Sequence, residues 1–379
     1  MGLTSLELPK YVSITNWKLN LAYYLLEIAM VILLLYRFVN FRQNSVQAVP
    51  QGQVVAWAEG HHDFDRSKLE ESISHANQTF CQNPGIYEYW WDPEGEWSYG
   101  PHECLGLCDN SGARGAKACI RPVETYIQEA SDQLFFVTEF AERYMDTENS
   151  SRYYFVPTTD AMSVGFEYSF SIFDNGPFES NTLSGFETVY ATESNILTIV
   201  VDQNSEGGYN YQYHLKPPAS VFLTVNEMLR LAGRSLNQFQ PRAGQNYLEG
   251  SPFPDGPMTR ICGIDLSIQI TCFNRLGDAL DSFSPIERDV LKSDQEWEIG
   301  PVCMLEVRPT PSYWSTLDKT EVIESDGSLR RRLYHGVRVR FSIGGSYYFL
   351  DFNKFLENLA TCIVYMALPG KVMLLFIIF

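Results

Sequence analysis

Basic residues are scarce in this chain of 379 residues. The 28 lysines and arginines stand against 46 aspartates and glutamates, which gives a formal net charge of −18. Duplex nucleic acid is therefore excluded as a partner, because phosphate binding requires clustered basic side chains. An acidic surface is instead compatible with cations. Since 45% of the residues are hydrophobic and 14% are aromatic, a disordered chain is excluded as well.

The common catalytic motifs are also missing from the sequence. It contains no Gly-x-Ser-x-Gly elbow, no phosphate-binding Gly-x-x-x-x-Gly-Lys-Ser/Thr loop, no His-Glu-x-x-His pair and no Gly-x-Gly-x-x-Gly turn. It has no internal repeat and no low-complexity tract. We therefore predict that the chain is not an enzyme, and we assign it no cofactor and no metal site.

An apolar stretch lies near each end of the chain. Between residues 21 and 39 only Glu27 and one arginine are charged, and the stretch is about as long as a bilayer-spanning helix. Residues 40–42 offer no small-residue cleavage site, so this stretch is not a removable signal. The second stretch, 355–379, is interrupted by a Pro-Gly-Lys sequence, which is tolerated in a membrane helix where neighbouring helices satisfy the freed carbonyls.

These stretches predict a multi-pass protein of the plasma membrane or an organelle membrane, in contact with lipid. We assign residues 1–20 to a cytoplasmic N-terminus, 21–40 to a first transmembrane helix, 41–350 to an extracellular or lumenal domain and 351–379 to a second transmembrane helix. Basic residues flank the first span on both sides, so they do not decide its orientation. The cysteines and glycosylation sequons described next indicate instead that residues 41–350 lie outside the cytosol.

Seven of the eight cysteines lie between the two apolar ends, a spread that fits disulfides in an oxidising compartment. Residues 81–119 are dense in Gly, Pro, Trp and Cys, and we predict that they form a disulfide-stapled insertion. Sequons at Asn77 and Asn149 agree with a domain outside the cytosol and are predicted glycosylation sites. The disulfide candidates are Cys81, Cys104, Cys108, Cys119, Cys262, Cys272 and Cys303.

Strand patterns dominate the middle of the chain. Apolar and polar residues alternate over 166–172, 264–270 and 337–343, a period of two that predicts half-buried antiparallel strands. Residues 194–202 and 209–215 are predicted to pair as a hairpin across a Gly-Gly turn. The domain is therefore predicted to be β-rich.

One helix is indicated inside this domain, over residues 225–232. Thr224 precedes it as an N-cap, Glu227 occupies the capping-box position, and Gly233 follows its end.

Polar residues recur every fourth position in the second predicted span, which places them on one face of a helix. Polar groups are costly toward lipid and usually face a bundle interior or a water path. We therefore predict that this face lines a pore or a helix contact. Its members are Asn353, Glu357, Thr361 and Tyr365. By the same reasoning, Glu27 should face another helix or the headgroup region.

Five segments in order resemble the ATP-gated purinergic receptor channels, the P2X family. They are "LPKYVSITNWKLNLAYYLLEI" at the first span, "VETYIQEASDQLFFVTEF", "EMLRLAG", "ICGIDLSIQITCF", and "LYHGVRVRFSIGG" before the second span. The resemblance implies a trimer of this chain or of related subunits, a central cation pore between the second spans, and extracellular binding of ATP between subunits. One two-span chain is too little helix to enclose a water path, so a pore also requires copies on physical grounds.

The resemblance places few of the family's nucleotide-binding residues in this chain. Arg308, in "LEVRP", matches one arginine of the family, and the register puts Leu333 or His335 at a lysine, with Arg332 adjacent. The two lysines that follow the first span in the family are absent from "VPQGQVVAWAEG". We take Arg308, Arg332 and His335 as candidate ligand-binding residues of a degenerate nucleotide site.

The sequence thus predicts a P2X-like trimeric ligand-gated cation channel whose pore is lined by the second span. The alternative is a membrane assembly or structural protein with the same fold that does not conduct or is not gated by ATP.

Overall fold

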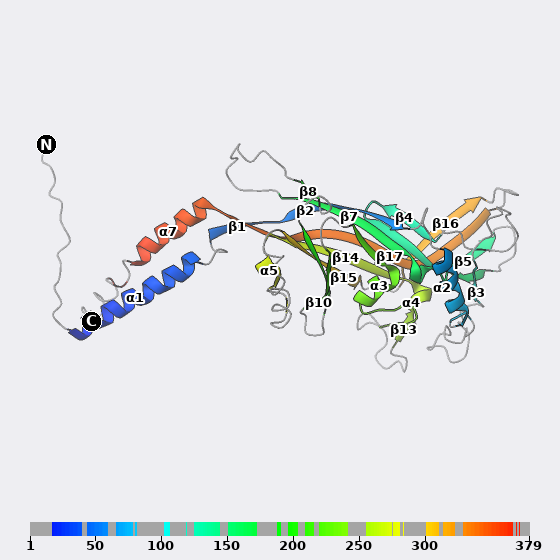
Figure 1. Ribbon diagram of the computed structural model, residues 1–379, viewed down its shortest axis with the longest axis horizontal. Coiled ribbons are helices and arrows are strands. Elements are labelled where there is room, and N and C mark those ends of the chain that lie inside the picture. Colours follow the sequence, from blue (N-terminus) through cyan, green and yellow to red (C-terminus); the bar gives the residue numbers. More distant parts are fainter. Residues whose placement is uncertain are drawn as a thin grey trace. The chain divides into compact units, whose positions relative to one another are not determined.

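The chain divides into two compact units in the computed structural model (Figure 1). Unit 1 comprises Met1–Ala48 and Tyr348–Phe379, and unit 2 comprises Val49–Tyr347. The structure describes residues 17–39, 44–59, 66–78, 80–81, 102–106, 119, 125–144, 151–172, 188–190, 196–203, 209–215, 220–241, 255–274, 276–280, 283, 301–310, 314–322, 329–366, 369 and 371.

Unit 1 contains the helices α1 (Trp17–Val39) and α7 (Phe352–Met366) and the short strand β1 (Ser45–Ala48). The carboxylate of Asp351 caps α7, because its Oδ1 accepts a hydrogen bond from the Asn353 amide at 2.8 Å. Lys354 Nζ donates to the Ser45 carbonyl at 3.1 Å, and Asn358 donates to the Asn44 side chain at 2.8 Å. Side-chain hydrogen bonds therefore fasten the first turns of α7 to the chain around the start of β1.

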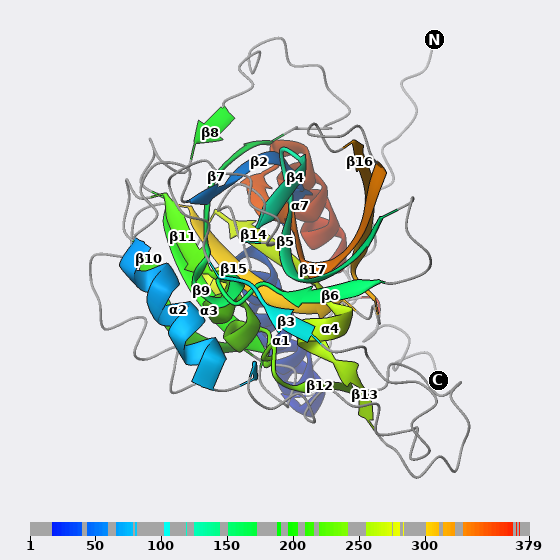
Figure 2. The ribbon, with the colours of Figure 1, turned by 90° about the vertical axis from the view of Figure 1, so that its right-hand side faces the viewer.

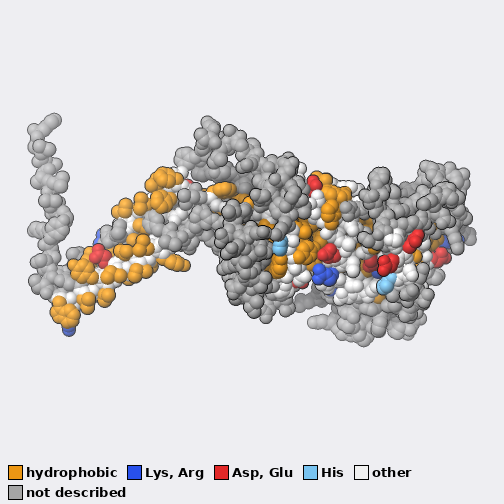
Figure 3. Space-filling view, in the orientation of Figure 1, with side chains coloured by type: hydrophobic (Ala, Val, Ile, Leu, Met, Phe, Trp, Pro, Cys, Tyr) orange, Lys and Arg blue, Asp and Glu red, His pale blue; other side chains and the backbone are white. Residues whose placement is uncertain are grey.

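Both helices of unit 1 expose apolar side chains along their length, as the orange residues in Figure 3 show. On α1 these are Trp17, Leu21, Tyr24, Leu25, Ile28, Val31, Ile32, Leu33, Leu35 and Tyr36, and on α7 they are Phe352, Leu356, Leu359, Ile363, Val364 and Tyr365. Within the described ranges, none of the helices combines the length and the apolar character that crossing a membrane requires.

The larger sheet of unit 2 follows the strand order β10, β9, β15, β14, β17, β5, β6, β3. β14 pairs antiparallel with β15 and parallel with β17, so the sheet is mixed. Figure 2 shows the curved course of β17 beside its neighbours β5 and β16. The strands are β3 (His102–Cys104), β4 (Tyr126–Ala130), β5 (Gln133–Tyr144), β6 (Arg152–Phe155), β9 (Leu197–Gln203), β10 (Tyr209–Leu215), β14 (Ile264–Phe273), β15 (Val302–Thr310), β16 (Thr316–Val322) and β17 (Leu329–Leu350).

A smaller sheet packs against the larger one. It consists of β2 (Pro50–Glu59), β7 (Ser163–Ile172), β8 (Thr188–Tyr190) and β11 (Val221–Thr224), in the order β11, β7, β2 with β8 beside β7. The ring centroids of Phe166 and Phe341 lie 4.8 Å apart across the two layers. At Gly52 an added Cβ would lie 2.6 Å from Ile343 Cδ1, so the close approach of the layers there requires glycine.

The period-two patterns form strands as predicted, and the burial of their residues explains the patterns. The prediction that all of them pair antiparallel is wrong for β14 and β17, which pair parallel with each other, because alternating burial does not depend on the direction of the neighbouring strand. In β14 the residues Ile264, Leu266, Ile268 and Ile270 are buried, while the residues between them from Ser267 onward are partly exposed. β9 and β10 pair antiparallel, which confirms the predicted hairpin; its turn lies outside the described residues. The alternation therefore indicates that one face of each strand packs into the core between the two sheets.

Short helices and one small ribbon complete unit 2. The predicted helix is α3 (Val225–Leu231): Thr224 Oγ1 accepts from the Glu227 amide at 3.0 Å, and Gly233 ends it with a φ of 65°. The Glu227 carboxylate accepts from Tyr213 Oη at 2.9 Å. The remaining elements are α2 (Arg66–Gln78), η4 (Thr159–Ala161), α4 (Thr259–Cys262), α5 (Leu276–Leu280), β12 (Phe239–Pro241) and β13 (Asp255–Met258).

Candidate functional site

Arg308, the first candidate ligand residue, lies on β15 with its side chain 43% exposed. Its Nε donates to Glu306 Oε1 at 2.5 Å, and its Nη2 donates to Tyr209 Oη at 3.2 Å. The hydrogen bond that Arg308 donates to Glu306 is the main cause of a raised pKa of Arg308. Much of the charge of this arginine is therefore balanced by a carboxylate two residues away on the same strand.

Arg332, the second candidate, is buried on β17. Its Nε donates to Glu142 Oε2 at 2.7 Å, and its guanidinium lies 4.7 Å from the centre of the Phe140 ring. Burial by itself would lower the pKa of Arg332, but the charges and hydrogen bonds of Tyr334 and Glu142 outweigh burial and raise it. Arg332 thus serves a buried ion pair inside the sheet.

The two arginines do not meet within one chain. Ser267 of β14 is in register with Arg308 on one side and with Arg340 of β17 on the other. Arg332 lies eight residues before Arg340 on the same strand, a separation of about 26 Å at the usual rise per strand residue. A shared ligand site for Arg308 and Arg332 would therefore have to involve more than one copy of the chain.

His335, the third candidate, belongs to a buried cluster of one carboxylate and two imidazoles. Its Nδ1 lies 2.5 Å from Glu139 Oε2, and His102 Nε2 lies 3.4 Å from Glu139 Oε1. The side chains of His102, Glu139 and His335 are 5%, 1% and 11% exposed. Burial by itself would raise the pKa of Glu139, but the hydrogen bonds and charges of the two histidines lower it below the usual value.

Aromatic rings and a hydroxyl enclose this acid–histidine cluster. The His102 ring stacks on Phe155 at 4.3 Å, and the Trp314 ring lies 5.5 Å from His335. Thr138 Oγ1 lies 2.7 Å from the carbonyl of Arg260 and 3.1 Å from that of His335, which ties β5 to β17 beside the cluster. The carboxylate and the two imidazoles therefore lie together in a site that is largely shielded from solvent.

A second cluster of charged residues lies on β17, and the sequence did not predict it. Arg338 Nε donates to Glu129 Oε2 at 2.9 Å and its Nη1 lies 3.5 Å from Asp265 Oδ1, while Arg340 Nη2 lies 3.7 Å from Asp265 Oδ2. Ser315 Oγ donates to Asp265 Oδ1 at 2.5 Å, so the buried Asp265 carboxylate has a hydrogen-bond partner as well as the two arginines. The sequence "VRVR" could have revealed this group, because its two arginines occupy the polar positions of a strand pattern and would each need an acid nearby.

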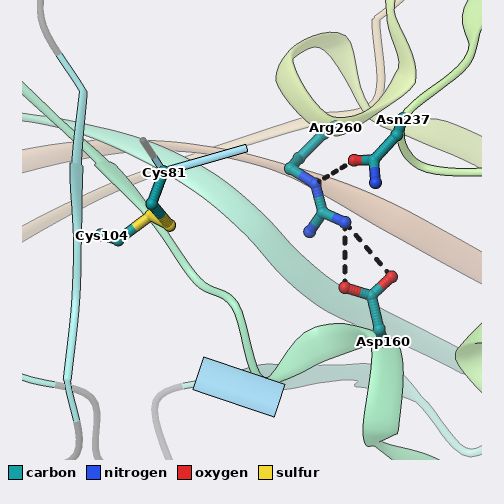
Figure 4. Close-up of a disulfide and its surroundings, with 5 residues drawn as sticks. All are labelled: Cys81, Cys104, Asp160, Asn237 and Arg260. Carbon is teal, nitrogen blue, oxygen red and sulfur yellow. Dashed lines mark hydrogen bonds and ion pairs between the residues drawn. A yellow bond between two sulfur atoms is a disulfide. The ribbon is translucent and has the colours of Figure 1, made fainter. Parts of the chain in front are cut away.

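Arg260 anchors a further buried site beside the first disulfide (Figure 4). Its Nη2 lies 2.9 Å from Asp160 Oδ2, its Nε donates to Asn237 at 2.8 Å, and its guanidinium lies 3.9 Å from the centre of the Phe80 ring. Arg260 is only 1% exposed and Asp160 is 32% exposed, so this ion pair joins the buried α4 to the more exposed η4. In the described part of the chain, no group of three or more His, Cys, Asp or Glu residues forms a metal site.

The cysteines follow the sequence analysis with one correction. Cys81 pairs with Cys104 and Cys272 pairs with Cys303, and Cys119 is also disulfide-bonded. Cys262, one of the predicted disulfide candidates, is instead a buried thiol at the end of α4, and it donates to the Gly263 carbonyl. Burial raises the pKa of this thiol. Cys108 lies outside the described residues.

The four predicted pore residues all lie on α7. Asn353, Glu357 and Tyr365 are exposed, and Thr361 is partly exposed, with its hydroxyl donating to the Glu357 carbonyl at 2.7 Å. Cys362, one residue after Thr361, is buried. The predicted sequon residue Asn77 lies in the last turn of α2. Asn149 lies outside the described residues.

No protein-family model matches the chain, and no curated protein matches its sequence. A solved structure of the chicken ATP-gated P2X7 receptor channel with the competitive antagonist TNP-ATP is similar, with a TM-score of 0.46 and 9% identity over 95% of this chain and 99% of that chain. A P2X receptor from the Gulf Coast tick with ATP and Zn²⁺ has a TM-score of 0.45 and 8% identity, over 94% of this chain and 99% of that chain.

These structural neighbours are P2X receptors, the family that the sequence motifs indicated. Both TM-scores lie below 0.5, so the function of the chain has to be argued from its own residues and contacts.

Proposed function

We propose that the chain is a two-span membrane protein whose copies assemble into a P2X-like, ligand-gated cation channel. The observation that supports this best is the character of α7. Its surface is largely apolar, with Phe352, Ile363 and Val364 from 59% to 68% exposed, yet the polar row that includes Asn353 and Glu357 runs along it. A helix with these two surfaces suits lipid on one side and a water path on the other.

We propose that lipid contacts the exposed apolar side chains of unit 1. Exposed apolar side chains in water are unfavourable in proportion to their area, and a contiguous apolar surface usually marks a membrane or protein contact. On α1, Tyr24, Leu25 and Ile32 are each about 60% exposed. We therefore propose that both helices enter the membrane, and that residues 41–350 lie outside the cytosol with Asn77 and Asn149 glycosylated.

A pore needs several copies of α7, because one chain contributes only one such helix and a water path has to be enclosed on all sides. We propose three copies, following the sequence resemblance. Rings of carboxylates favour cations, and in a trimer Glu357 would form such a ring. Binding of a ligand or partner between copies would shift β17, which runs to Leu350, and thereby α7, which begins at Phe352.

A second candidate function is a membrane assembly that ATP does not gate, or that does not conduct. The ion pairs of the candidate ligand residues favour it. ATP would have to replace Glu306 at Arg308 and Glu142 at Arg332, and the second exchange would leave a buried carboxylate without its cation. Removing one partner of a buried ion pair typically costs about 3–5 kcal/mol.

Current recorded from cells that express the chain tests the conduction pathway. We expect Glu357→Gln to lower cation selectivity or conductance at unchanged surface expression, since it removes the carboxylate ring. The matched control is Glu167→Gln, an exposed glutamate of unit 2, which should leave the current as in the wild type. Equal currents from the wild type and Glu357→Gln would contradict the assignment of Glu357 to the pore.

ATP addition separates the two candidate functions. A current that appears with ATP and is lost in Arg308→Ala supports nucleotide gating. A surface-expressed chain whose current is unchanged by ATP supports the second candidate. Treatment with a glycosidase checks the orientation, because loss of mass in the wild type but not in Asn77→Gln/Asn149→Gln places residues 41–350 outside the cytosol.

A further inference from the structure

The two disulfides whose pairing is described lie in different surroundings. Cys272 and Cys303 are in register on β14 and β15, and both are at 0% exposure. Cys81 and Cys104 are partly exposed, and they pack against an apolar cluster that includes Phe80. A thiol in solution can therefore reach the Cys81–Cys104 bond, whereas the sheet covers the Cys272–Cys303 bond.

A buried cation lies beside the partly exposed disulfide (Figure 4). The guanidinium of Arg260 is 3.9 Å from the centre of the Phe80 ring, and Phe80 directly precedes Cys81. Ile261, the residue after Arg260, belongs to the apolar cluster against which both cysteines pack. The residues that adjoin the cation and the disulfide in sequence therefore pack together.

The partners of Arg260 use only part of its hydrogen-bonding capacity. Its Nη2 lies 2.9 Å from Asp160 and its Nε donates to Asn237, but its Nη1 is buried without an acceptor among the described residues. Asp160 is 32% exposed and Arg260 is 1% exposed, so water screens the carboxylate more than the guanidinium. A donor and part of a positive charge are therefore available to a negative group that forms nearby.

A dithiol opens a disulfide in two exchange steps. Its first thiolate attacks one sulfur and forms a mixed disulfide, while the electron pair of the broken bond leaves on the other cysteine as a thiolate. Its second thiolate then displaces the remaining cysteine. The dithiol is oxidised to a disulfide, and both cysteines take up the protons that the dithiol gave to water. A nearby cation stabilises the departing thiolate and speeds the exchange.

The Cys81–Cys104 bond joins the end of α2 to β3. The Cys81 amide donates to the Ala76 carbonyl at 2.9 Å, so Cys81 is also fixed to α2 by its backbone. β3 has three residues, ends the strand order of the larger sheet, and pairs on that path with β6. Opening the bond therefore removes the covalent link between α2 and a short strand at the end of the sheet.

We propose that Cys81–Cys104 is a redox-reactive disulfide that small-molecule thiols open, with Arg260 stabilising the cysteine thiolate that leaves, while Cys272–Cys303 stays closed. Opening separates β3 from α2 and loosens its pairing with β6. Unit 2 thereby responds to the thiol content of the surrounding fluid. This property goes beyond the proposed function, since it requires neither a pore nor a nucleotide.

Thiol trapping on the purified full chain in detergent micelles tests the proposal. Thiols that are already accessible are blocked with N-ethylmaleimide, dithiothreitol is added for increasing times, and newly formed thiols are trapped with iodoacetamide and located by mass spectrometry. In the wild type, Cys81 and Cys104 should be trapped at least about tenfold faster than Cys272 and Cys303. Equal rates for the two disulfides, or faster opening of Cys272–Cys303, would overturn the proposal.

Variants of the cation separate an electrostatic role from a structural one. In Arg260→Gln the opening of Cys81–Cys104 should be about threefold slower, the change that thiol exchange shows for a leaving thiol one pKa unit less acidic. Arg260→Lys keeps the charge and should retain most of the wild-type rate. The control is Arg230→Gln, an exposed arginine of α3, which should leave the rate unchanged. A purely structural role predicts faster opening in Arg260→Gln, and an unchanged or faster rate would overturn the role of the cation.

Asp160→Asn decides if Arg260→Gln does not fold. It removes the anion that offsets Arg260, so it should speed the opening of Cys81–Cys104 more than that of Cys272–Cys303; equal increases would contradict the proposal.

Hydrogen exchange tests the release of β3. The Leu105 amide, which donates to the Phe155 carbonyl at 3.2 Å where β3 ends, should exchange faster once Cys81–Cys104 is reduced, while the α3 peptide stays unchanged. The Cys81→Ser/Cys104→Ser variant should show the faster exchange without reductant. Unchanged exchange at Leu105 in both cases would refute the release of β3.

Discussion

The two units place their apolar residues in opposite ways. In unit 2 the apolar side chains of the strands are almost completely buried between two sheets, as Phe166, Leu266 and Val339 are at 0% exposure. In unit 1 comparable side chains stand exposed, such as Phe352 at 67% and Ile32 at 62%. Unit 2 therefore has its own hydrophobic core, whereas these side chains of α1 and α7 are not covered within the described part of the chain.

The difference extends to charged residues. Unit 2 buries Arg260 and Arg332, each paired with a carboxylate, and Glu139, which lies against two histidines. In unit 1 the acid Glu357 is exposed on α7. Buried charges that are paired inside one chain fix its strands, while an exposed charge on an apolar helix points to water or to another copy.

Phe166→Ala against Phe352→Ala tests the comparison most strongly. The first variant opens a cavity between the sheets of unit 2, where Phe166 faces Phe341, and should lower its free energy of unfolding by about 3–5 kcal/mol. The second removes an exposed ring from α7 and should leave that free energy unchanged. Denaturant unfolding of the full chain in detergent measures both. Equal losses in stability would mean that Phe352 is packed as tightly as Phe166, which would contradict the comparison of the two units.

Asp160→Asn should cost about 3 kcal/mol, because it removes the carboxylate that balances the buried Arg260. Its control is Asp318→Asn, which breaks the exposed pair with Arg331 on β16 and β17 and should not change stability measurably. Thermal unfolding of both variants beside the wild type decides the question. A loss in Asp318→Asn as large as that in Asp160→Asn would show that burial does not set the strength of these pairs.

Thr224→Ala should destabilise unit 2 by about 1 kcal/mol, since it removes the acceptor for the Glu227 amide at the start of α3. Thr224→Ser keeps the hydroxyl and should stay close to the wild type. Chemical denaturation of the three proteins provides the measurement. An equal loss in both variants would assign the effect to the lost methyl group and not to the cap.

The smallest effect concerns pH. The pKa of Glu139 is lowered from its ordinary 4.5 in the folded chain, so its ionised form stabilises unit 2 above that pH, and the stabilisation is lost as the pH falls through the lower folded value. In Glu139→Gln the unfolding midpoint should therefore depend less on pH between about pH 5 and pH 3 than in the wild type. Glu167→Gln is the control. Parallel pH profiles for the wild type and Glu139→Gln would refute this role.

Much of the fold could be predicted from local patterns. The alternation over 264–270 reflects burial of every second residue against the other sheet, and the Thr224 cap and Gly233 stop are determined by neighbours in sequence. Such features depend on residues a few positions apart, which the sequence displays directly.

The contacts of the candidate site could not be predicted, because they join residues far apart in sequence. His335 and Glu139 are separated by 196 positions, and Arg332 and Glu142 by 190. Arg332 and His335 were expected to bind a ligand as free cations or donors, but strand pairing gives each a carboxylate of the same chain. Cys262 likewise is a buried thiol at the end of α4, which cysteine spacing does not reveal.

Accessibility of spin labels in phospholipid vesicles tests the central claim that lipid covers the exposed helices of unit 1. Labels at Ile32 of α1 and Ile363 of α7 are compared with one at Val55 of β2, since all three side chains are from 55% to 62% exposed. The proposal predicts that Ile32 and Ile363 are open to dissolved oxygen and shielded from a water-soluble nickel complex, while Val55 is open to nickel. Equal nickel accessibility at all three positions would contradict it.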